Sequence, residues 1–252
     1  ICDPLDLKID KIWHFACPAS RVHYERDPIK TSKTNFIGTY NMLDLARRNN
    51  ANFLLASSSE VYGEPKKIPQ EETLLGVVNP ISKKACYAEG KRIAESLCAD
   101  FMRVHNLEIR IARIFNTYGP RMQSNDGRVI SNFIFNALRD KPIKVYGTGQ
   151  QTRSFCFVDD LTEGLMKLMN ANYMYPVNLG NPFEYFTILE LLKIIVNKIK
   201  TNSRTEFCEP LSYDPIRRKP CIKLASEILK WEPKIDLYDG LEITISELVK
   251  NF

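Results

Sequence analysis

The feature that most constrains the fold is a regular alternation of short apolar runs with longer segments of helical periodicity. Three runs of six mostly apolar residues, at 11–16, 52–57 and 108–113, have the length of buried strands. Between them, apolar residues recur at helical spacing over 28–48 and 83–104. Mostly apolar strands joined by helices are typical of a parallel sheet that is buried on both faces. We therefore predict an α/β fold, a doubly wound parallel sheet with helices on both sides.

The rest of the chain is less regular and predicts a smaller lobe packed on the sheet. Thr187 precedes an amphipathic segment, and Glu190 follows three residues later, which is the capping-box signature of a helix start. We expect a sheet domain over 1–179, with an insertion at roughly 120–157 that belongs to the lobe, and a C-terminal lobe over 180–252. The elements predicted after residue 120 are helices at 128–138, 159–169, 187–200 and 239–249 and strands at 143–146 and 176–180.

Tyr87 and Lys91 are the first residues with a chemical signature. They stand four residues apart in the segment 83–104, so on a helix both side chains leave the same face one turn apart. An ammonium close to a phenol favours the phenolate, so we expect the pKa of Tyr87 to lie below the reference value of about 10. Such a tyrosine can take a proton from a hydroxyl near neutral pH. The same spacing occurs by chance on many helices, so the pair alone does not establish catalysis.

Polar side chains follow the apolar run 52–57 directly. Ser58, Ser59 and Glu60 are expected at the carboxyl edge of the sheet, where open parallel sheets bind ligands. Two hydroxyls and a carboxylate at one strand end can handle protons. Serines at this position can also simply cap a turn, but Glu60 is harder to explain in that way.

Composition excludes several classes of protein. The 252 residues carry a net charge of +5 without a basic run, so we expect a small anionic ligand and no nucleic acid. No apolar run reaches the roughly 18 residues of a membrane helix, so we expect no membrane segment in this chain. The seven cysteines are scattered, odd in number and without a CxxC pair, as is typical of reduced thiols in a cytoplasmic protein. With only three histidines we expect no metal site, and we interpret His14 as a strand histidine with a hydrogen-bond partner.

Longer motifs then carry a resemblance. Residues 57–63 (SSSEVYG), Tyr87 with Lys91, and residues 113–120 (RIFNTYGP) are similar to the extended short-chain dehydrogenase/reductase family of nucleotide-sugar enzymes. The family has a Rossmann-type sheet and a C-terminal substrate lobe. More narrowly, the chain resembles the UDP-glucuronate decarboxylases (UDP-xylose synthases) from its first strand to its last helix. The motifs that carry this narrower resemblance are 85–92, 119–122, 125–129, 151–155, 178–182, 218–220 and 231–233.

The residue before Glu60 favours decarboxylation within that family. The resemblance implies that the sugar 4,6-dehydratases typically have an Asp there, which expels the C6 hydroxyl, and that the 4-epimerases usually lack the Glu. Ser59 cannot act as that acid. A glucuronate carries a carboxylate at C6, and oxidising C4 to a ketone makes it a β-keto acid. Such an acid loses carbon dioxide readily, because the electrons flow into an enolate.

For the oxidation step, the resemblance implies three residues. Tyr87, assisted by Lys91, would remove the proton of the C4 hydroxyl while NAD+ takes a hydride. Ser58 would hydrogen-bond the same oxygen. NADH, still bound, would later reduce C4 again, so the reaction has no net redox change.

For the decarboxylation step, it implies another three. Glu60 and Ser59 would position the substrate carboxylate and manage protons as carbon dioxide leaves. Arg218 would reach over from the lobe to stabilise the enolate or supply the C5 proton. The product would be UDP-xylose.

The same mapping implies two sets of binding residues. A planar guanidinium gives paired hydrogen bonds, so arginines are expected to hold the substrate and its diphosphate. Beside Glu60 and Arg218, the residues implied for the UDP-sugar are Lys33, Asn41, Asn116, Arg128 and Arg153, with Val145 and Tyr146 lining a uracil pocket. The residues implied for NAD are Phe15, Cys17, Thr34, Ser57, Tyr87, Lys91 and Thr117.

Two departures from the family pattern bear on these expectations. Arg21 stands where the decarboxylases usually have a small residue or proline, so the loop near the substrate is expected to differ. The Gly-rich phosphate loop and the acidic residue for the adenosine ribose are absent, because no GxxGxxG or GxGxxG occurs in the chain. In the family they lie in an opening βαβ unit of roughly 50–60 residues with its following strand. The chain begins with Ile1 and not with Met, and we expect its start to be missing, which would leave a sheet edge and an apolar face exposed.

Three alternatives stay open. The first is a decarboxylase that releases a UDP-4-keto-pentose and NADH, and the second is a dTDP-glucose 4,6-dehydratase-like enzyme, against which Ser59 speaks. The third is a non-catalytic nucleotide-sugar-binding or dimerisation remnant, favoured only if the chain truly begins at Ile1. The resemblance further implies a homodimer, in which the helices around 36–48 and Tyr87 form a four-helix bundle.

Overall fold

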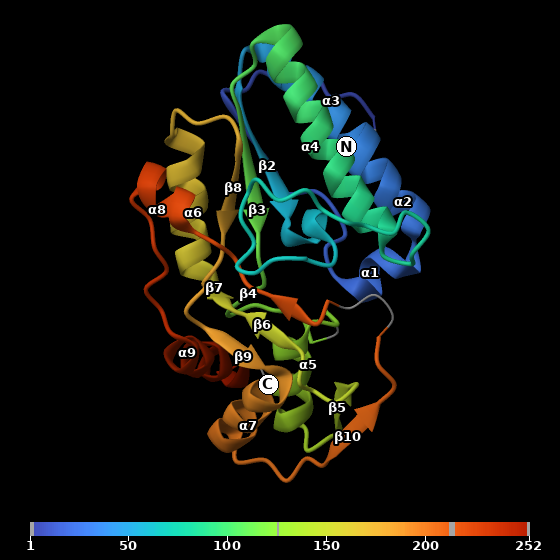
Figure 1. Ribbon diagram of the computed structural model, residues 1–252, viewed down its shortest axis with the longest axis vertical. Helices are drawn as coiled ribbons and strands as arrows, with labels where there is room; N and C mark the ends of the chain where they lie inside the picture. The colour runs from blue at the N-terminus through green and yellow to red at the C-terminus, as the bar shows by residue number, and fades with distance from the viewer. Residues whose placement is uncertain (1–2, 125, 212–214, 251–252) are drawn as a thin grey trace.

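A four-stranded parallel sheet lies at the centre of the computed structural model, which describes residues 3–250 except 125 and 212–214 (Figure 1). Ile1, Cys2 and Asn125 of the motif 125–129 therefore lie outside the described residues. All strand pairings in this sheet are parallel, so the carboxyl ends of its strands meet at one edge. The predicted parallel α/β sheet is confirmed. Its order is β1-β2-β3-β8, formed by Lys11–His14, Asn52–Ser58, Ile109–Ile114 and Pro176–Leu179.

Helices cover both faces of this sheet, which explains why its strands read as continuous apolar runs. On β2, Phe53 and Leu55 point to one face and Leu54 to the other, and all three are fully buried. Helices α3 and α4 lie side by side on the first face, and α6 and α8 lie on the second (Figure 1). The bounds of these helices are Thr39–Asn49 for α3, Ala85–His105 for α4, Val158–Asn170 for α6 and Lys223–Leu229 for α8.

The helix predicted over 28–48 is present, but as three successive pieces. Helix α2 (Pro28–Lys33) runs into a π-helical turn, η1 (Thr34–Gly38), and then into α3. At this turn Asn35 packs against Gly90 of α4. A Cβ atom on Gly90 would lie 2.6 Å from Asn35 Nδ2, so the close approach of the two helices requires a glycine. The π turn thus lies where Gly90 allows α4 to approach.

A second apolar cluster builds the lobe that lies below the sheet in Figure 1. Helices α5, α7 and α9 pack there around side chains such as Phe133, Leu191 and Leu241. The predicted capping box is confirmed: Glu190 N donates to Thr187 Oγ1 (3.1 Å), and Thr187 N donates to Glu190 Oε2 (2.7 Å). The lobe elements are α5 (Val129–Leu138), β5 (Ile143–Tyr146), α7 (Ile188–Ile199), β10 (Thr205–Cys208) and α9 (Leu237–Lys250).

Short strands between the sheet and the lobe were not predicted, because two or three residues show no periodicity. Strand β11 (Arg217–Arg218) pairs in parallel with β6 (Thr152–Ser154), which pairs antiparallel with β9 (Tyr185–Thr187). Strand β4 (Thr117–Tyr118) pairs with β7 (Cys156–Phe157). After β11 the chain returns to the sheet. Helix α8 packs there with β8 and α6, and the buried ring of Trp231, which follows α8, belongs to the same cluster. The division into domains at 179 and 180 stays a prediction.

Within the described sheet, β1 is an edge strand with a partly exposed apolar side. Trp13 and Phe15 are 39% and 49% exposed, and their rings stack with centroids 6.4 Å apart. Over the part of the chain that the structure describes, no helix combines the length and apolarity needed to span a membrane.

Candidate active site

Helix α4 carries Tyr87 and Lys91 on the face that packs against β2. The two side chains share one helix face, as their spacing predicted, and both are buried. Lys91 Nζ donates to the carbonyl of Ala56 (2.8 Å) and lies 5.8 Å from the centre of the Tyr87 ring. An ammonium is thereby fixed beside a phenol at the carboxyl end of β2.

The predicted lowering of the Tyr87 pKa is wrong for this structure. Burial raises the pKa of Tyr87 to about 12, although a hydrogen bond with Ser58 acts in the opposite direction. Burial also lowers the pKa of Lys91, because an ammonium loses hydration in the interior. The spacing of the two residues was interpreted correctly, but it contains no information on how deeply the pair is buried.

Beyond β2 the chain turns into a 3-10 helix, η2 (Ser59–Tyr62), which turns Glu60 toward the lobe. Ser58 Oγ accepts a hydrogen bond from Glu60 N (3.2 Å), so the turn-capping alternative applies to Ser58 in addition to its contact with Tyr87. Ser57 Oγ donates to Glu95 Oε1 of α4 (2.5 Å). That contact fastens the strand end to the helix that carries Tyr87.

Glu60 joins the end of β2 to β11, the short strand that carries Arg218. Its Oε1 accepts a hydrogen bond from Arg218 Nη1 of β11 (2.7 Å), and its Oε2 accepts one from Lys84 Nζ (3.4 Å). Burial alone would raise the pKa of Glu60, but the charges of Arg218 and Lys84 outweigh it and hold the pKa at about 2, below its ordinary 4.5. The structure therefore contains an ionised carboxylate between two cations, next to Tyr87.

Sequence reasoning missed two residues at this centre. Tyr24 of α1 (Arg21–Arg26) stacks on Tyr87, with ring centroids 5.3 Å apart and planes 11° apart. A six-residue helix gives too weak a periodic signal to reveal this contact. Lys84 stands one residue before α4, and only the folded chain brings its ammonium to Glu60. Arg21, which stands where the decarboxylases usually have a small residue or proline, is the first residue of α1, and its Nε pairs with Glu25 Oε1 (2.6 Å).

The arginines predicted for the substrate lie in different surroundings. Arg153 is buried on β6 directly opposite Arg218 of β11, and its Nη1 donates to Thr152 O (2.8 Å). Arg128 occupies the N-cap position of α5 without a side-chain capping bond, and its Nε pairs with Asp126 (3.3 Å). Its charge favours the phenolate of Tyr87, although burial outweighs this effect and the pKa of Tyr87 is raised. Arg153 and Arg218 therefore form one pair of neighbours beside Glu60.

The other predicted binding residues differ in exposure, and their roles stay predictions. Val145 is fully buried in the core of the lobe, so only its backbone is available to a ligand, whereas Tyr146 is exposed. Lys33 is exposed on α2, and Asn41 is buried on α3. Residues with partial or high exposure near the ends of β1, β3 and η1 are Phe15, Cys17, Thr34, Asn116 and Thr117.

His14 has the structural role that was predicted. Its Nε2 and Thr39 Oγ1 are 3.0 Å apart, and burial, with the charge of Lys91, lowers the pKa of His14 to about 4. It is a neutral strand histidine with a hydrogen-bond partner. Within the described ranges, no three His, Cys, Asp or Glu side chains gather as metal ligands.

Comparison with known sequences identifies relatives along nearly the whole chain. A profile of the NAD dependent epimerase/dehydratase family matches residues 4–180. UDP-glucuronic acid decarboxylase 4 of Arabidopsis thaliana is 55% identical over 247 residues, 98% of this chain and 56% of that protein. UDP-glucuronic acid decarboxylase 1 of Danio rerio is 51% identical over 97% of this chain and 58% of its own length. The chain thus spans little more than half the length of these relatives.

Solved structures share the fold at lower identity. UDP-glucose 4-epimerase of Thermotoga maritima, determined with UDP-glucose, superposes with a TM-score of 0.89 at 27% identity, over 96% of this chain and 78% of that one. UDP-glucuronic acid 4-epimerase of Bacillus cereus, in complex with UDP-glucuronic acid and NAD, gives a TM-score of 0.87 at 27% identity, over 97% and 76% of the two chains. The Rossmann-type fold is therefore established.

The Glu60 ion pair predicts a pH-dependent stability. Because the pKa of Glu60 in the folded state lies below its ordinary 4.5, its ionised form stabilises the fold fully above about pH 5, and this contribution falls away as the pH drops toward 2. At pH 7, Glu60→Gln leaves Arg218 buried without its carboxylate, and we expect a loss of roughly 2–5 kcal/mol in the free energy of unfolding.

Urea unfolding of both proteins at pH 7 and pH 3 measures this effect. The difference between them should shrink at the lower pH. Glu71→Gln, in the exposed Lys67–Glu71 pair, is the control and should change the free energy of unfolding by less than about 1 kcal/mol at either pH. An equal loss for Glu60→Gln at both values would contradict the assignment of an ionised Glu60.

Proposed function

This chain belongs to the NAD dependent epimerase/dehydratase family, and on that premise we propose that it decarboxylates UDP-glucuronate to UDP-xylose with bound NAD. The relatives named decarboxylases, at 51–55% identity over nearly all of the chain, support this activity. The structural observation that carries the proposal is the ion pair of Glu60 and Arg218 beside Tyr87 and Lys91. These residues combine a tyrosine–lysine pair suited to the oxidation of a sugar with an ion pair suited to binding a substrate carboxylate.

The residues at the strand edge fit the nicotinamide end of NAD. Lys91 has three N–H donors and donates to the Ala56 carbonyl, so its ammonium retains donors for ribose hydroxyls. The buried hydroxyl of Ser20, after β1, has no partner among the described atoms. Phe15, Cys17 and Thr34 are the further residues that we propose for this end. When bound, NAD+ would accept a hydride from C4 of the sugar and later return it.

Each step of the proposed reaction has residues of this chain to assist it. Tyr87 would take the proton of the C4 hydroxyl as a phenolate, with Ser58 hydrogen-bonded to the same oxygen. Burial disfavours that form, so the step relies on the positive charges of Lys91 and of a bound nicotinamide to favour it. The resulting 4-ketone makes the C6 carboxylate a β-keto acid, whose C5–C6 bond breaks and leaves its electrons in an enolate. The guanidinium of Arg218 would stabilise that negative charge, because a buried cation is little screened. A proton delivered to C5 and reduction of C4 would complete UDP-xylose.

The charges around Glu60 support decarboxylation over dehydration. With a pKa of about 2, Glu60 is ionised at neutral pH and is no acid for expelling a hydroxyl. Ser59, buried next to it, has no acidic proton to give either. We propose that Glu60 instead orients Arg218, and that Ser59 hydrogen-bonds the substrate carboxylate, while Arg153, Arg128 and the residues of the uracil pocket hold the nucleotide.

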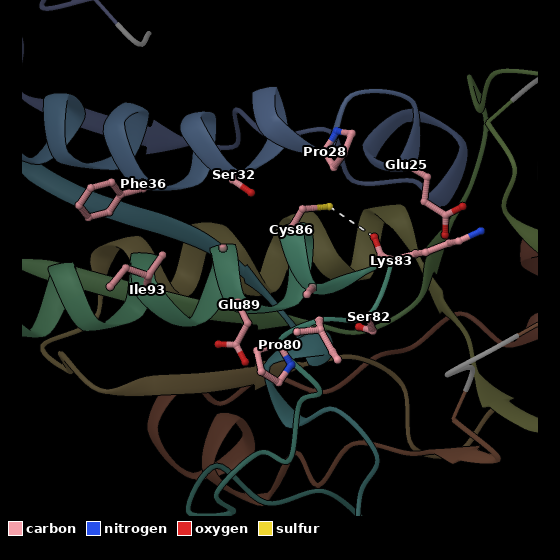
Figure 2. Close-up of a pocket in the computed structure, with 13 residues that line it drawn as sticks. Glu25, Pro28, Ser32, Phe36, Pro80, Ser82, Lys83, Cys86, Glu89 and Ile93 are labelled. Carbon is pink, nitrogen blue, oxygen red and sulfur yellow. Dashed lines mark hydrogen bonds between the residues drawn. The ribbon is translucent and has the colours of Figure 1, made fainter.

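We also propose a homodimer formed through the helices on the α3–α4 face. A groove of about 810 Å³ lies between the α2–η1 helix and α4, and Figure 2 shows Pro28, Ser32 and Phe36 facing Cys86 and Ile93 across it. Apolar side chains lie open along these helices: Ile29 is 72% exposed and Tyr40 is 50% exposed. A second copy would bury them and complete four helices.

A cytoplasmic location belongs to the same proposal. Six cysteines in the described part of the chain are free thiols: Cys17, Cys86, Cys98, Cys156, Cys208 and Cys221. Free thiols persist in a reducing compartment. This location requires that the nucleotide-sugar substrate is also present in the cytoplasm.

The proposed reaction is tested by incubating the full-length gene product that contains these residues with UDP-glucuronate and NAD+. We expect carbon dioxide and UDP-xylose in equal amounts and no lasting NADH absorbance. Tyr87→Phe should lower kcat by at least about 1,000-fold, because it removes the proton acceptor. The matched control is Tyr24→Phe, which keeps the ring stacked on Tyr87 and should stay within about tenfold of the wild type.

The other outcomes each select an alternative. Carbon dioxide with stoichiometric NADH would indicate release of the UDP-4-keto-pentose. Absence of carbon dioxide, together with binding of UDP-glucuronate, would contradict the enzyme and leave a nucleotide-sugar-binding protein. A dehydrated dTDP-4-keto-6-deoxy sugar from dTDP-glucose would move the chain to the dehydratases.

The dimer is tested by light scattering coupled to size-exclusion chromatography. Phe36→Glu puts a charge into the groove, and we expect it to convert the dimer to a monomer. Phe207→Glu, on β10 in the lobe, changes a ring away from the groove that is even more exposed (63% against 49% for Phe36) and should leave the dimer intact. A monomeric wild type, or an unaffected Phe36→Glu dimer, would overturn the proposed interface.

A further inference from the structure

A buried amide, Asn178, lies where the sheet meets the chain that carries Arg218. Asn178 is on β8 and fully buried. Its Nδ2 donates to the carbonyls of Gln70 (2.9 Å) and Cys221 (3.1 Å), and its Oδ1 accepts a hydrogen bond from Tyr62 OH (2.7 Å). One side chain of the sheet therefore binds two segments that are about 150 residues apart in sequence.

Gln70 holds the residues just after Arg218. Gln70 N donates to Lys219 O (2.7 Å), and Cys221 N donates to Gln70 O (2.7 Å). Lys219 N donates to the Gln70 side chain at Oε1 (3.3 Å). These bonds form an isolated parallel bridge between Gln70 and Pro220. We call Gln70, Asn178 and the segment 219–221 the clamp.

The clamp is also tied to the helix of Tyr87. Arg113 Nη1 donates to Tyr62 OH (3.0 Å), and the Arg113 guanidinium makes two hydrogen bonds to the carboxylate of Glu95 on α4 (3.0 and 2.7 Å). Glu95 in turn accepts from Ser57 at the end of β2 (2.5 Å). A continuous chain of hydrogen bonds thus links α4, β2, β3 and β8 to the segment after Arg218.

The strand that carries Arg218 needs such support, because its own pairing is short. Strand β11 has two residues, with Arg217 exposed and Arg218 buried. Since side chains alternate along a strand, a slip by one residue would turn Arg218 away from Glu60. Pairing over two residues with β6 specifies the register weakly. The bonds from Gln70 and Asn178 fix it immediately beyond.

We propose that Asn178 is a positioning residue, which acts with Gln70 to hold β11 in the register that brings Arg218 onto Glu60. The inference deepens the proposed decarboxylation and rests on it where catalysis is concerned. Asn178 touches neither Glu60 nor Arg218 in the contacts described above, so its effect on Arg218 passes through the backbone of 219–221. Its bond with Tyr62 is one tie toward α4, but the Arg113–Glu95 ion pair and the Ser57–Glu95 hydrogen bond hold α4 to the sheet without it. Its loss should therefore affect the step that needs Arg218, and not the oxidation at Tyr87.

The test compares Asn178→Ser, whose shorter side chain cannot reach both carbonyls, with the wild-type enzyme. We expect kcat for carbon dioxide release to fall by at least about tenfold, with KM for UDP-glucuronate changed by less than about threefold. In a single turnover, NADH should form at nearly the wild-type rate and then persist, because the 4-ketone waits for decarboxylation. Gln70→Met, which loses only the bond from Lys219 N, should change the same step in the same direction by a smaller factor.

Two controls separate positioning from a general loss of stability. Asn181→Ser makes the same substitution three residues further on, at a buried amide whose Oδ1 accepts from Phe183 N (2.9 Å) and Glu184 N (3.3 Å), and should leave the rate of each step within about twofold. In the Arg218→Lys background, Asn178→Ser should not lower the rate of carbon dioxide release further, because both substitutions act through the guanidinium of residue 218. Multiplied losses, or equal slowing of oxidation and decarboxylation, would overturn the proposal.

A measurement without catalysis keeps the two proposals apart. The coupling of Glu60 and Arg218 is obtained from urea unfolding of Glu60→Gln, Arg218→Met and the double variant. This coupling should largely disappear when the same cycle is measured with Asn178→Ser as the parent. If the wild type releases no carbon dioxide, the proposed function is wrong, and the positioning role of Asn178 is then tested by this unfolding cycle alone. A Glu60–Arg218 coupling that is unchanged by Asn178→Ser would overturn the positioning role.

Discussion

The ion pair between Glu60 and Arg218 is the interaction on which the rest of the site depends. Two charges taken out of water are stable only when they meet with good geometry, and removal of one leaves the other at a high cost. Glu60 comes from η2, the turn that follows β2, and Arg218 from β11, a two-residue strand between the sheet and the lobe. The fold must therefore bring two distant segments together closely enough to form a 2.7 Å contact. This requirement connects the sheet, the lobe and the clamp.

The elements on either side of this pair divide the chemistry. Helix α4 and β2 present Tyr87, Lys91 and Ser58 as one rigid unit, because the parallel sheet and its core fix both elements. The short strands between the sheet and the lobe present Arg218 on β11, with Arg153 of β6 directly opposite it. A sugar bound between them would meet a proton acceptor at C4 and a cation at C6. The activity that we propose follows from this division, and the clamp explains how the two halves keep their relative position.

The sequence predicted the parts of the fold whose signal is local. The apolar runs at 52–57 and 108–113 became β2 and β3, and Thr187 with Glu190 formed the expected capping box. It could not predict β11, since two residues have no period, nor Lys84 and Tyr24 at the site, since only tertiary folding brings them there. The pKa of Tyr87 was predicted in the wrong direction, because residue spacing reveals a nearby ammonium but not the burial that opposes it. The residues proposed for catalysis and binding came from motifs, whereas Asn178 and Gln70 were noticed only through their contacts in the structure.

In the proposed reaction, one site oxidises C4, releases carbon dioxide and restores C4 without exchange of the transferred hydrogen. The most direct test follows the isotope in UDP-glucuronate that carries deuterium at C4, incubated with NAD+ and the full-length gene product in ordinary water. We expect UDP-xylose that retains the deuterium at C4 and has gained one solvent hydrogen at C5. Loss of the label from C4 in a product that is nevertheless UDP-xylose would contradict this expectation, because the hydrogen would then have left the site between the two redox steps.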